Sequence, residues 1–421
     1  MPMKQSIRRS IAWALLLAAA PAPTLANLTL DDSIDLALRN NPRILAARQK
    51  VEVANGRAVQ AGLWSNPELE LTAEEMPIDS GGLSSSKNLI GVAQTISFPG
   101  KKSLDRKIGV ADIQTTQSEY ISQQLALVRR VKRAFFRTLA AQEKLTVTQQ
   151  LLTLAESLVG TTAKRVKAGA ATDQEQLRVE IEQERAAVQH SSQRRELTDA
   201  QKQLATLLGQ PGEPVPRLHG AWRQPSDFLD MANRGAQSLE QHPVLRMAVN
   251  HVERTELELR RAKLEAMPDP TVVVAVGNDE AANETIMDFR VSLPLPLFDR
   301  AQGRKRVTHA MVDIARFDVM TIQQQLLEEW SLSASRIAAA TEQVEAYRAR
   351  ILPKAEKALQ LVQRGYDAGR FDLLDLLDIQ RTTAESKIAY YDKLFELHAA
   401  AADLESLLPP QDRNTRKGME E

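Results

Sequence analysis

One short stretch occurs twice in this chain, about 200 positions apart. The clearer copy, GYDAGRFDLLDLLDIQ, runs from Gly365 to Gln380, and the weaker copy, RVKAGAATDQEQL, runs from Arg165 to Leu177. Gly169 and Gly369 suit the left-handed backbone position that ends a helix. Long segments of helical periodicity flank each copy on both sides. Each copy is therefore predicted to be the tight tip of a long helical hairpin.

The residues after each glycine carry signals for the start of a new helix. Thr172-Asp173-Gln174-Glu175 has the pattern of a capping box, and Asp372 can serve as the N-cap in the second copy. Pro353 is expected to bend or interrupt the second outgoing helix. The predicted outgoing helices are Lys101–Lys167 and Gly303–Arg364, and the predicted return helices are Thr172–Leu208 and Asp372–Leu408.

Each half of the chain also contains a predicted β-hairpin, at residues 68–98 and 271–293. In both, apolar residues alternate with polar ones, the period of a strand with two different faces. This gives four strands per chain, each about as long as a strand that crosses a bilayer. Four strands cannot close on themselves, so a water-filled pore requires several chains. The alternative is a soluble helical protein with two small surface hairpins.

The order of elements repeats, which predicts two structural repeats at 27–227 and 228–408. The first holds helices, the hairpin 68–98, the helical hairpin 101–208 and a Pro/Gly-rich connector from Gly209 to Asp227; the second holds the hairpin 271–293 and the helical hairpin 303–408. Asn41-Pro42 matches His242-Pro243 as a helix start. The return helix and the helix after Pro42 together match the outgoing helix in length. These two shorter helices are expected to stack end to end beside it.

The N-terminus is predicted to be a secretory signal peptide, residues 1–26, and residues 409–421 are predicted to be a disordered tail. A single membrane anchor is the alternative for the first segment, although its apolar run, Ile11 to Ala20, is short for a span. The chain has no cysteine and a formal net charge of zero, which argues against disulfides, thiolate metal sites and nucleic-acid binding. No phosphate-binding loop or nucleophile motif is present, so the chain is not expected to be an enzyme or to need a cofactor.

These motifs together resemble the TolC-like outer-membrane efflux family. The resemblance covers nearly the whole mature chain and rests on Asn40-Asn41-Pro42, on Trp64-Ser65-Asn66-Pro67, on the strand exits SFPGKK and LPLPLFDRAQG, and on the second tip. The strand exits look most like the heavy-metal branch, the outer-membrane component of cobalt–zinc–cadmium pumps. Many relatives carry a lipidated N-terminal cysteine, and this chain has none.

The resemblance implies a fold and partners. The fold would be mainly α-helical, with long helical hairpins and four strands per chain that close as a twelve-stranded barrel in a homotrimer. The barrel would lie in the outer membrane and the helices would form a tunnel through the periplasm. The partners would be a periplasmic adaptor protein and an inner-membrane pump of the resistance–nodulation–division type. The duct itself would hydrolyse nothing.

Two sets of residues are candidates for function. The tip residues would meet the adaptor, with plain helix capping as the alternative; they are Gly169, Thr172, Asp173, Gly369 and Asp372. Acids facing the conduit of a trimer would form rings of three carboxylates that favour cations, with a solvated surface as the alternative. These acids are Asp372, Asp375 and Asp378 after the second tip, and Glu68, Glu70 and Glu74 on the first strand. The six histidines have no metal-binding spacing.

The sequence therefore predicts a passive outer-membrane exit duct of a tripartite efflux system, with divalent heavy-metal cations as cargo. A duct for drugs or organic solutes is the first alternative. A periplasmic coiled-coil scaffold without a pore is the alternative from another class.

Overall fold

The computed structural model describes residues 28–76, 82–232 and 236–408. The predicted signal peptide (1–26) and the predicted disordered tail (409–421) lie outside these residues. In chain order the helices and strands are α1 (Leu30–Asn40), α2 (Pro42–Gly62), β1 (Glu68–Glu74), β2 (Lys87–Thr95), α3 (Lys101–Lys167), α4 (Asp173–Leu207), α5 (Pro225–Ala232), α6 (Pro243–Lys263), β3 (Thr271–Asp279), β4 (Glu284–Ser292), α7 (Gln302–Ala346), α8 (Leu352–Asp367) and α9 (Leu373–Leu407).

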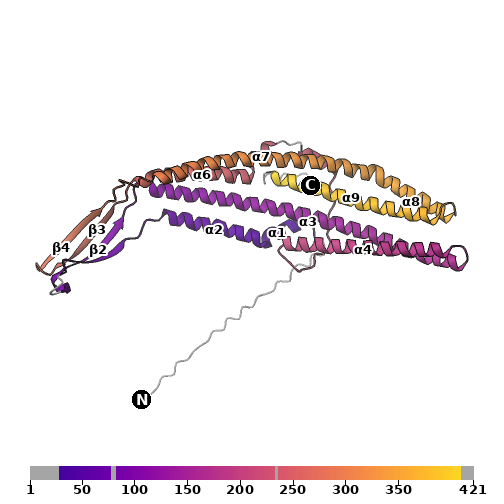
Figure 1. Cartoon of the computed structure of the whole chain (residues 1–421), viewed down its shortest axis with the longest axis horizontal. Helices are drawn as coiled ribbons and strands as arrows, with labels where there is room; N and C mark the ends of the chain where they lie inside the picture. The colour runs from indigo at the N-terminus through magenta and orange to yellow at the C-terminus, as the bar shows by residue number, and fades with distance from the viewer. Residues whose placement is uncertain (1–27, 77–81, 233–235, 409–421) are drawn as a thin grey trace, which may run out of the picture.

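The molecule is elongated, with the β-strands at one end and the two helical turns, α3–α4 and α8–α9, at the other (Figure 1). Within the described ranges, none of the helices has an apolar stretch long enough to cross a bilayer.

The longest element is α3, an unbroken helix of 67 residues from Lys101 to Lys167. The sequence predicts these bounds because no proline and no cluster of breakers falls inside them. At 1.5 Å per residue the helix is about 100 Å long. Four other helices, α2, α4, α6 and α9, pack along it. It is therefore the element around which the rest of the chain is arranged.

The helices form four columns, which Figure 1 shows side by side. The first column is α2 and α4 end to end, the second is α3, the third is α6 and α9 end to end, and the fourth is α7 with α8. Each column packs on the next in this order. The predicted end-to-end stacking of the shorter helices is confirmed. Within the described residues, each outer column packs extensively against one neighbouring column only.

The two end-to-end joints are built in the same way. Asn41 caps α2 by accepting a hydrogen bond from Arg43 N (3.0 Å), and its Nδ2 donates to the carbonyl of Leu207 at the end of α4 (2.9 Å). His242 caps α6 through Nδ1, which accepts from Val244 N (3.3 Å), and its Nε2 donates to a carbonyl at the end of α9 (3.3 Å). One side chain thus starts one helix and satisfies a free carbonyl of the other.

The four strands form one antiparallel sheet in the order β1-β2-β3-β4. The second strand is Lys87–Thr95. It ends before residue 98, where the predicted hairpin ends, because the apolar pattern of the sequence continues past the last paired residue. β1 and β4 are the two edges of the sheet. β1 continues from the first column of helices, and β4 leads into the fourth. The edges of the sheet and the edges of the helical layer therefore lie on the same two sides of the molecule.

One face of the sheet is apolar and exposed. Its side chains are Leu69, Leu71, Ile90, Val92, Val274, Val276, Met287, Phe289 and Val291. The other face carries small side chains in its middle and charged ones on the outer strands. Arg290 on β4 forms ion pairs with Glu70 (3.6 Å) and Glu74 (3.5 Å) on β1, although two strands lie between them. The sheet is therefore strongly curved, with the charged face on the inside of the curve.

A buried aromatic and polar cluster lies where the connector after α4 crosses α3 and α9. The rings of Phe136, Trp222 and Phe228 surround His398, which is 1% exposed. His398 Nε2 accepts a hydrogen bond from Arg223 N (3.1 Å), and its Nδ1 donates to a backbone carbonyl within α9 (2.9 Å). Burial lowers the pKa of His398 to about 4. This imidazole is therefore neutral and held in one orientation.

Next to this cluster, three charged side chains form a partly buried network. Glu405 accepts hydrogen bonds from Lys132 of α3 and from Arg223 of the connector, the latter at 3.0 Å. Burial alone would raise the pKa of Glu405, but these two bases hold it below its usual value. The network ties α3, α9 and the connector together at one level.

The fourth column is interrupted as the sequence predicts. A π-helical turn, Tyr347–Ile351, separates α7 from α8. Pro353 has no N–H to donate to the carbonyl four residues earlier, so the regular α-helical ladder cannot continue through this point. Arg348 of the turn donates to Gln224 of the connector (2.8 Å). The break is therefore placed beside the belt of connectors at mid-length.

Candidate functional site

The first tip has the geometry that its sequence predicts. Gly169 has φ +71°, the left-handed conformation, and Ala170 N donates to the carbonyl of Arg165 (2.8 Å) to close the helix end. Thr172 and Glu175 form a capping box: Glu175 N donates to Thr172 Oγ1 (3.2 Å), and Thr172 N donates to the Glu175 carboxylate (2.7 Å). Asp173, the first residue of α4, is exposed.

The second tip repeats this geometry with carboxylates. Gly369 has φ +70°, and Arg370 N donates to the carbonyl of Gly365 (2.7 Å). Asp372 caps α9 by accepting from Asp375 N (2.9 Å), and its own N–H is turned toward the Asp375 carboxylate (3.4 Å). Asp375, predicted as a conduit acid, is thus the second member of a capping box. Capping accounts for the local arrangement of both aspartates.

A direct contact joins the two tips. Arg165 Nη1 donates to the hydroxyl of Tyr366 (2.9 Å), and the guanidinium lies over the Tyr366 ring, 5.7 Å from its centroid. Beneath them, Leu158 and Val179 of the first hairpin pack with Leu376 of the second. Sequence reasoning assigned no role to Arg165 or Tyr366. The only sequence feature that could have pointed to their contact is that each lies in one copy of the repeated stretch.

A groove runs between α4 and α9 just behind the tips. Its volume is about 410 Å³, and its lining includes Ile181, Leu374, Asp378 and Arg381. Asp378, another predicted conduit acid, forms an ion pair with Arg381 (2.7 Å). On α4 near this groove, Leu177 and Ile181 are more than half exposed. The tips thus present apolar side chains between charged ones, the composition of a protein-binding surface.

The acids predicted on the first strand lie along β1. Glu70 and Glu74 face the inside of the curved sheet, where both pair with Arg290. Glu68 is in register with the same face. Asp288 joins the group through Arg290 (3.0 Å). The structure therefore brings the predicted acids together, and adds a basic residue that the sequence analysis did not include.

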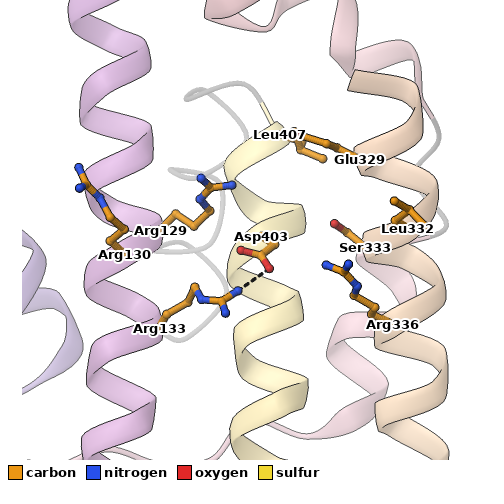
Figure 2. A pocket seen from close by; sticks show the side chains of 9 residues that line it. All are labelled: Arg129, Arg130, Arg133, Glu329, Leu332, Ser333, Arg336, Asp403 and Leu407. Carbon is orange, nitrogen blue, oxygen red and sulfur yellow. Dashed lines mark hydrogen bonds and ion pairs between the residues drawn. The ribbon is translucent and has the colours of Figure 1, made fainter. Parts of the chain in front are cut away.

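A second polar cleft of about 440 Å³ lies at mid-length, between α3, α7 and α9 (Figure 2). Arg133 pairs with Asp403 (2.6 Å) across it; among the described residues, the other arginines of the cleft have no ion-pair partner. Burial, with repulsion from Arg43 and Arg129, lowers the pKa of Arg130. The cleft has an excess of positive charge. Its lining is Arg129, Arg130, Arg133, Glu329, Leu332, Ser333, Arg336, Asp403 and Leu407.

Metal-binding groups do not gather in the described part of the chain: no three His, Cys, Asp or Glu side chains there are placed to hold an ion. The buried His398 and His242 are both engaged by backbone groups, as described above.

The chain was compared with known protein families and structures. The family described as "Outer membrane efflux protein" matches residues 33–210 and 236–408. The chain is 24% identical to the cobalt-zinc-cadmium resistance protein CzcC of Cupriavidus metallidurans, over 90% of each chain. It is also 24% identical to the pyoverdine export outer membrane protein OpmQ of Pseudomonas putida, over 85% of this chain and 81% of that one.

Solved structures share the fold. The structure of CusC aligns with a TM-score of 0.73 at 18% identity and covers 90% of this chain and 91% of that one. At this level of identity the likeness extends to the fold alone.

Proposed function

The chain belongs to the outer membrane efflux protein family, and from this premise we propose that it is the exit channel of a tripartite pump that exports divalent heavy-metal cations. The observation that carries the choice of cargo is its similarity to a cobalt-zinc-cadmium resistance protein over 90% of each chain. The strand exits, which resemble the heavy-metal branch, support the same choice.

We propose that the working unit is a homotrimer in the outer membrane, with its helices extending into the periplasm. Both edges of the sheet, β1 and β4, have free backbone groups along one side. Such edges are stable when another strand pairs with them. The outer helical columns lie on the same two sides and carry exposed apolar residues, such as Ile314 and Phe317 on α7 and Val53 and Val59 on α2. Joining β4 of one chain to β1 of the next would cover both.

We assign the tips to docking of a periplasmic adaptor, which would link the channel to an inner-membrane pump of the resistance–nodulation–division type. The residues are Gly169, Thr172, Asp173, Gly369 and Asp372. Support comes from their position at the far end of the molecule from the sheet (Figure 1). The exposed apolar residues behind them, Leu177 and Ile181, add further support. The tight turns would fix the shape of this surface, so capping and docking are compatible roles.

Two substitutions test this assignment. Gly369→Pro removes the left-handed turn, and Asp372→Lys removes the cap and reverses a charge. Both are expected to abolish efflux while trimer formation and membrane insertion remain. The control is Glu385→Lys, an exposed residue further along α9. Normal resistance in both tip variants, with the trimer intact, would remove the docking assignment.

We also propose that the conduit prefers cations. Glu68, Glu70 and Glu74 on the inner face of the sheet, and Asp375 and Asp378 near the tip, would supply the negative charge. Arg290 partly neutralises the first group, so Arg290→Gln is expected to increase cation preference. The measurement is the reversal potential of purified trimers in a salt gradient. An anion-selective potential in the unmodified protein would contradict the proposal.

The cargo is tested by growth of a deletion strain on zinc, cobalt, cadmium, nickel, copper and silver, beside a panel of drugs and detergents. Sensitivity limited to one or a few metals is expected. The second candidate, export of an organic solute, is favoured by the similarity to a pyoverdine export protein. Sensitivity to organic compounds alone would select it. Family membership gives no support to the third alternative, a scaffold without a pore.

A further inference from the structure

Within one chain, a polar junction forms where β2 leaves the sheet beside the start of β3. We propose that a similar junction forms between two chains, at the point where β4 of one copy leaves the sheet beside the start of β1 of the next copy. The partner is a second copy of this chain, and the contact pairs Gln302 of one copy with Asn66 of the other. The inference rests on the proposed trimer, and it identifies the contact that sets the register of neighbouring copies.

The template is the junction within the chain. Lys101, the first residue of α3, is 5% exposed and donates to both carboxylate oxygens of Asp269 (2.9 Å each). Its Nζ also donates to the carbonyl of Met267 (2.7 Å). Asp269 accepts a further hydrogen bond from Phe98 N (2.6 Å). This junction ties the end of β2 to the start of β3, at the point where the sheet meets the helices.

The second half of the chain also has a left-handed residue at the corresponding position. Gly100, before α3, and Ala301, before α7, both adopt the left-handed conformation, with φ +98° and +57°. An alanine rarely adopts this conformation, so its presence indicates that the turn itself is required. The first helical residue after it is Gln302, which therefore corresponds to Lys101.

The counterpart of Asp269 is Asn66. Each residue precedes a proline, and each lies two positions before its strand begins, β3 at Thr271 and β1 at Glu68. Within one chain, however, Asn66 and Gln302 belong to opposite edges of the sheet. The strand order β1-β2-β3-β4 places β2 beside β3, and leaves β4 and β1 to meet only in neighbouring copies.

The side chains around the proposed contact are exposed in the single chain. Trp64 is 59% exposed and Phe298 is 90% exposed, and both are large apolar residues in loops at the sheet edges. The side-chain amide of Gln302 is turned back onto its own loop: its Nε2 donates to the Phe298 carbonyl (3.1 Å), and its Oε1 accepts from Arg300 N (2.8 Å). A neighbouring copy would cover these apolar side chains.

The chemistry of the two junctions is matched pair by pair. Within the chain the pair is Lys with Asp, two opposite charges; between chains it would be Gln with Asn, two amides. Each amide can donate and accept, so the pair can form hydrogen bonds without placing a charge at the interface. A crossed pair, Lys with Asn or Gln with Asp, would leave a buried charge without its counter-charge. The two junctions are therefore chemically distinct. This difference disfavours contacts in which Gln302 meets Asp269 or Lys101 meets Asn66.

The absence of cysteine from the sequence makes a direct test possible. The double variant Asn66→Cys/Gln302→Cys, treated with a short bis-maleimide in outer-membrane fractions, is expected to give covalent dimers and trimers on denaturing gels. The matched control is Lys101→Cys/Asp269→Cys, which should be linked within one chain and stay at the monomer position. Each single-cysteine variant should also stay there.

Three results separate this inference from the proposed function. Covalent dimers and trimers in the first variant alone support both. A protein that native mass spectrometry shows to be trimeric, but whose first variant remains monomeric on the gel, would overturn the junction and leave the channel. A protein that is monomeric in native mass spectrometry would overturn both.

A charge exchange gives a second, independent readout. Gln302→Lys alone is expected to lower the temperature at which trimers dissociate in detergent. Adding Asn66→Asp, which recreates the charged pair of the template, is expected to restore it. Equal dissociation temperatures in the single variant, the double variant and the unmodified protein would overturn the proposed contact.

Discussion

The two halves of the chain use one plan and the same kind of capped joint, but the side chains packed beside the joints differ in chemistry. At the end of α4, the side chains that fill the joint are apolar, among them Leu204 and Ala205, which are 0% and 2% exposed. At the end of α9, the corresponding region contains the buried His398 and the partly buried Glu405, which both bond to the connector. The comparison shows that the stacked-helix joint requires filled space and satisfied polar groups, and that either kind of side chain can supply them.

The long helices that lead to the two tips also differ between the halves. α3 continues without a break, whereas the corresponding helix of the second half is divided by the π-helical turn before Pro353. Both helices end in tips of the same geometry. The first tip therefore ends one unbroken helix, whereas the second tip is separated from α7 by the π-helical turn.

The largest effect is expected from Glu405→Ala. This change leaves Lys132 and Arg223 in a partly buried site without their counter-charge, and breaking such a pair costs about 3–5 kcal/mol of unfolding free energy. Thermal unfolding followed by circular dichroism measures it. The control in the first half is Glu182→Ala, which removes an exposed ion pair with Arg185 and is expected to cost at most about 1 kcal/mol. Equal losses in the two variants would show that the Glu405 network contributes no more than an exposed ion pair of the first half.

The second prediction concerns pH. The pKa of His398 is about 4 in the folded chain and 6.5 as a reference, so the unfolded chain binds the proton more tightly. Stability is therefore expected to fall as the pH drops from about 6.5 to about 4, by up to about 3 kcal/mol. Glu405 acts in the same direction at lower pH, where its stabilisation is lost as it becomes protonated.

The variant His398→Gln keeps a hydrogen-bond acceptor but does not titrate. It should lose the part of the pH dependence that lies above the pKa of Glu405. Denaturant unfolding at pH 7 and pH 5 makes the comparison. A pH dependence unchanged by this substitution would assign the effect to other groups.

A third prediction addresses the interrupted helix. Pro353→Ala supplies the missing N–H and allows a regular helix through Tyr347–Ile351. Amide exchange in this segment is expected to slow by about tenfold, equivalent to about 1.4 kcal/mol of local opening free energy. Residues 147–151 of α3, at the corresponding place in the first half, should show no change. Faster exchange in the variant would mean that the break is imposed by packing instead of by the proline.

The smallest effect is expected at the contact between the tips. Tyr366→Phe removes the hydrogen bond from Arg165 but keeps the ring beneath the guanidinium. The loss should be about 1 kcal/mol, visible as faster amide exchange at both tips. Arg165→Met, which also removes the cation–π contact, should have the larger effect. Exchange that changes at one tip only would show that the contact does not couple the two.

The sequence predicts what depends on neighbouring residues. The glycine at each tip, the capping box of Thr172 and Glu175, and the bounds of α3 all follow from local backbone and capping preferences, and the structure confirms each of them. The strands are confirmed as well, but β2 ends at Thr95, before the predicted Phe98, because pairing with β3 ends there. A strand boundary depends on a partner that the local pattern does not contain.

Contacts between the two halves were not predictable in this way. Arg165 reaches Tyr366, and Arg290 reaches Glu70 and Glu74, across about 200 residues of sequence. They depend on how the halves pack and on the curvature of the sheet. The role of Asp375 as a capping partner follows local rules, because it stands three residues after the N-cap residue Asp372.

The length of α3 restricts how such a chain can evolve. Deleting four residues from it would shorten the second column by about 6 Å and leave its neighbours unchanged. The helices α2 and α4, which meet end to end at Asn41 and the Leu207 carbonyl, would then be out of register with the side chains of α3 on which they pack. A tolerated change in length would have to occur together in all four columns, in whole helical turns. Descendants of this sequence are therefore expected to vary in the connector and tail, and to keep the lengths of their long helices fixed.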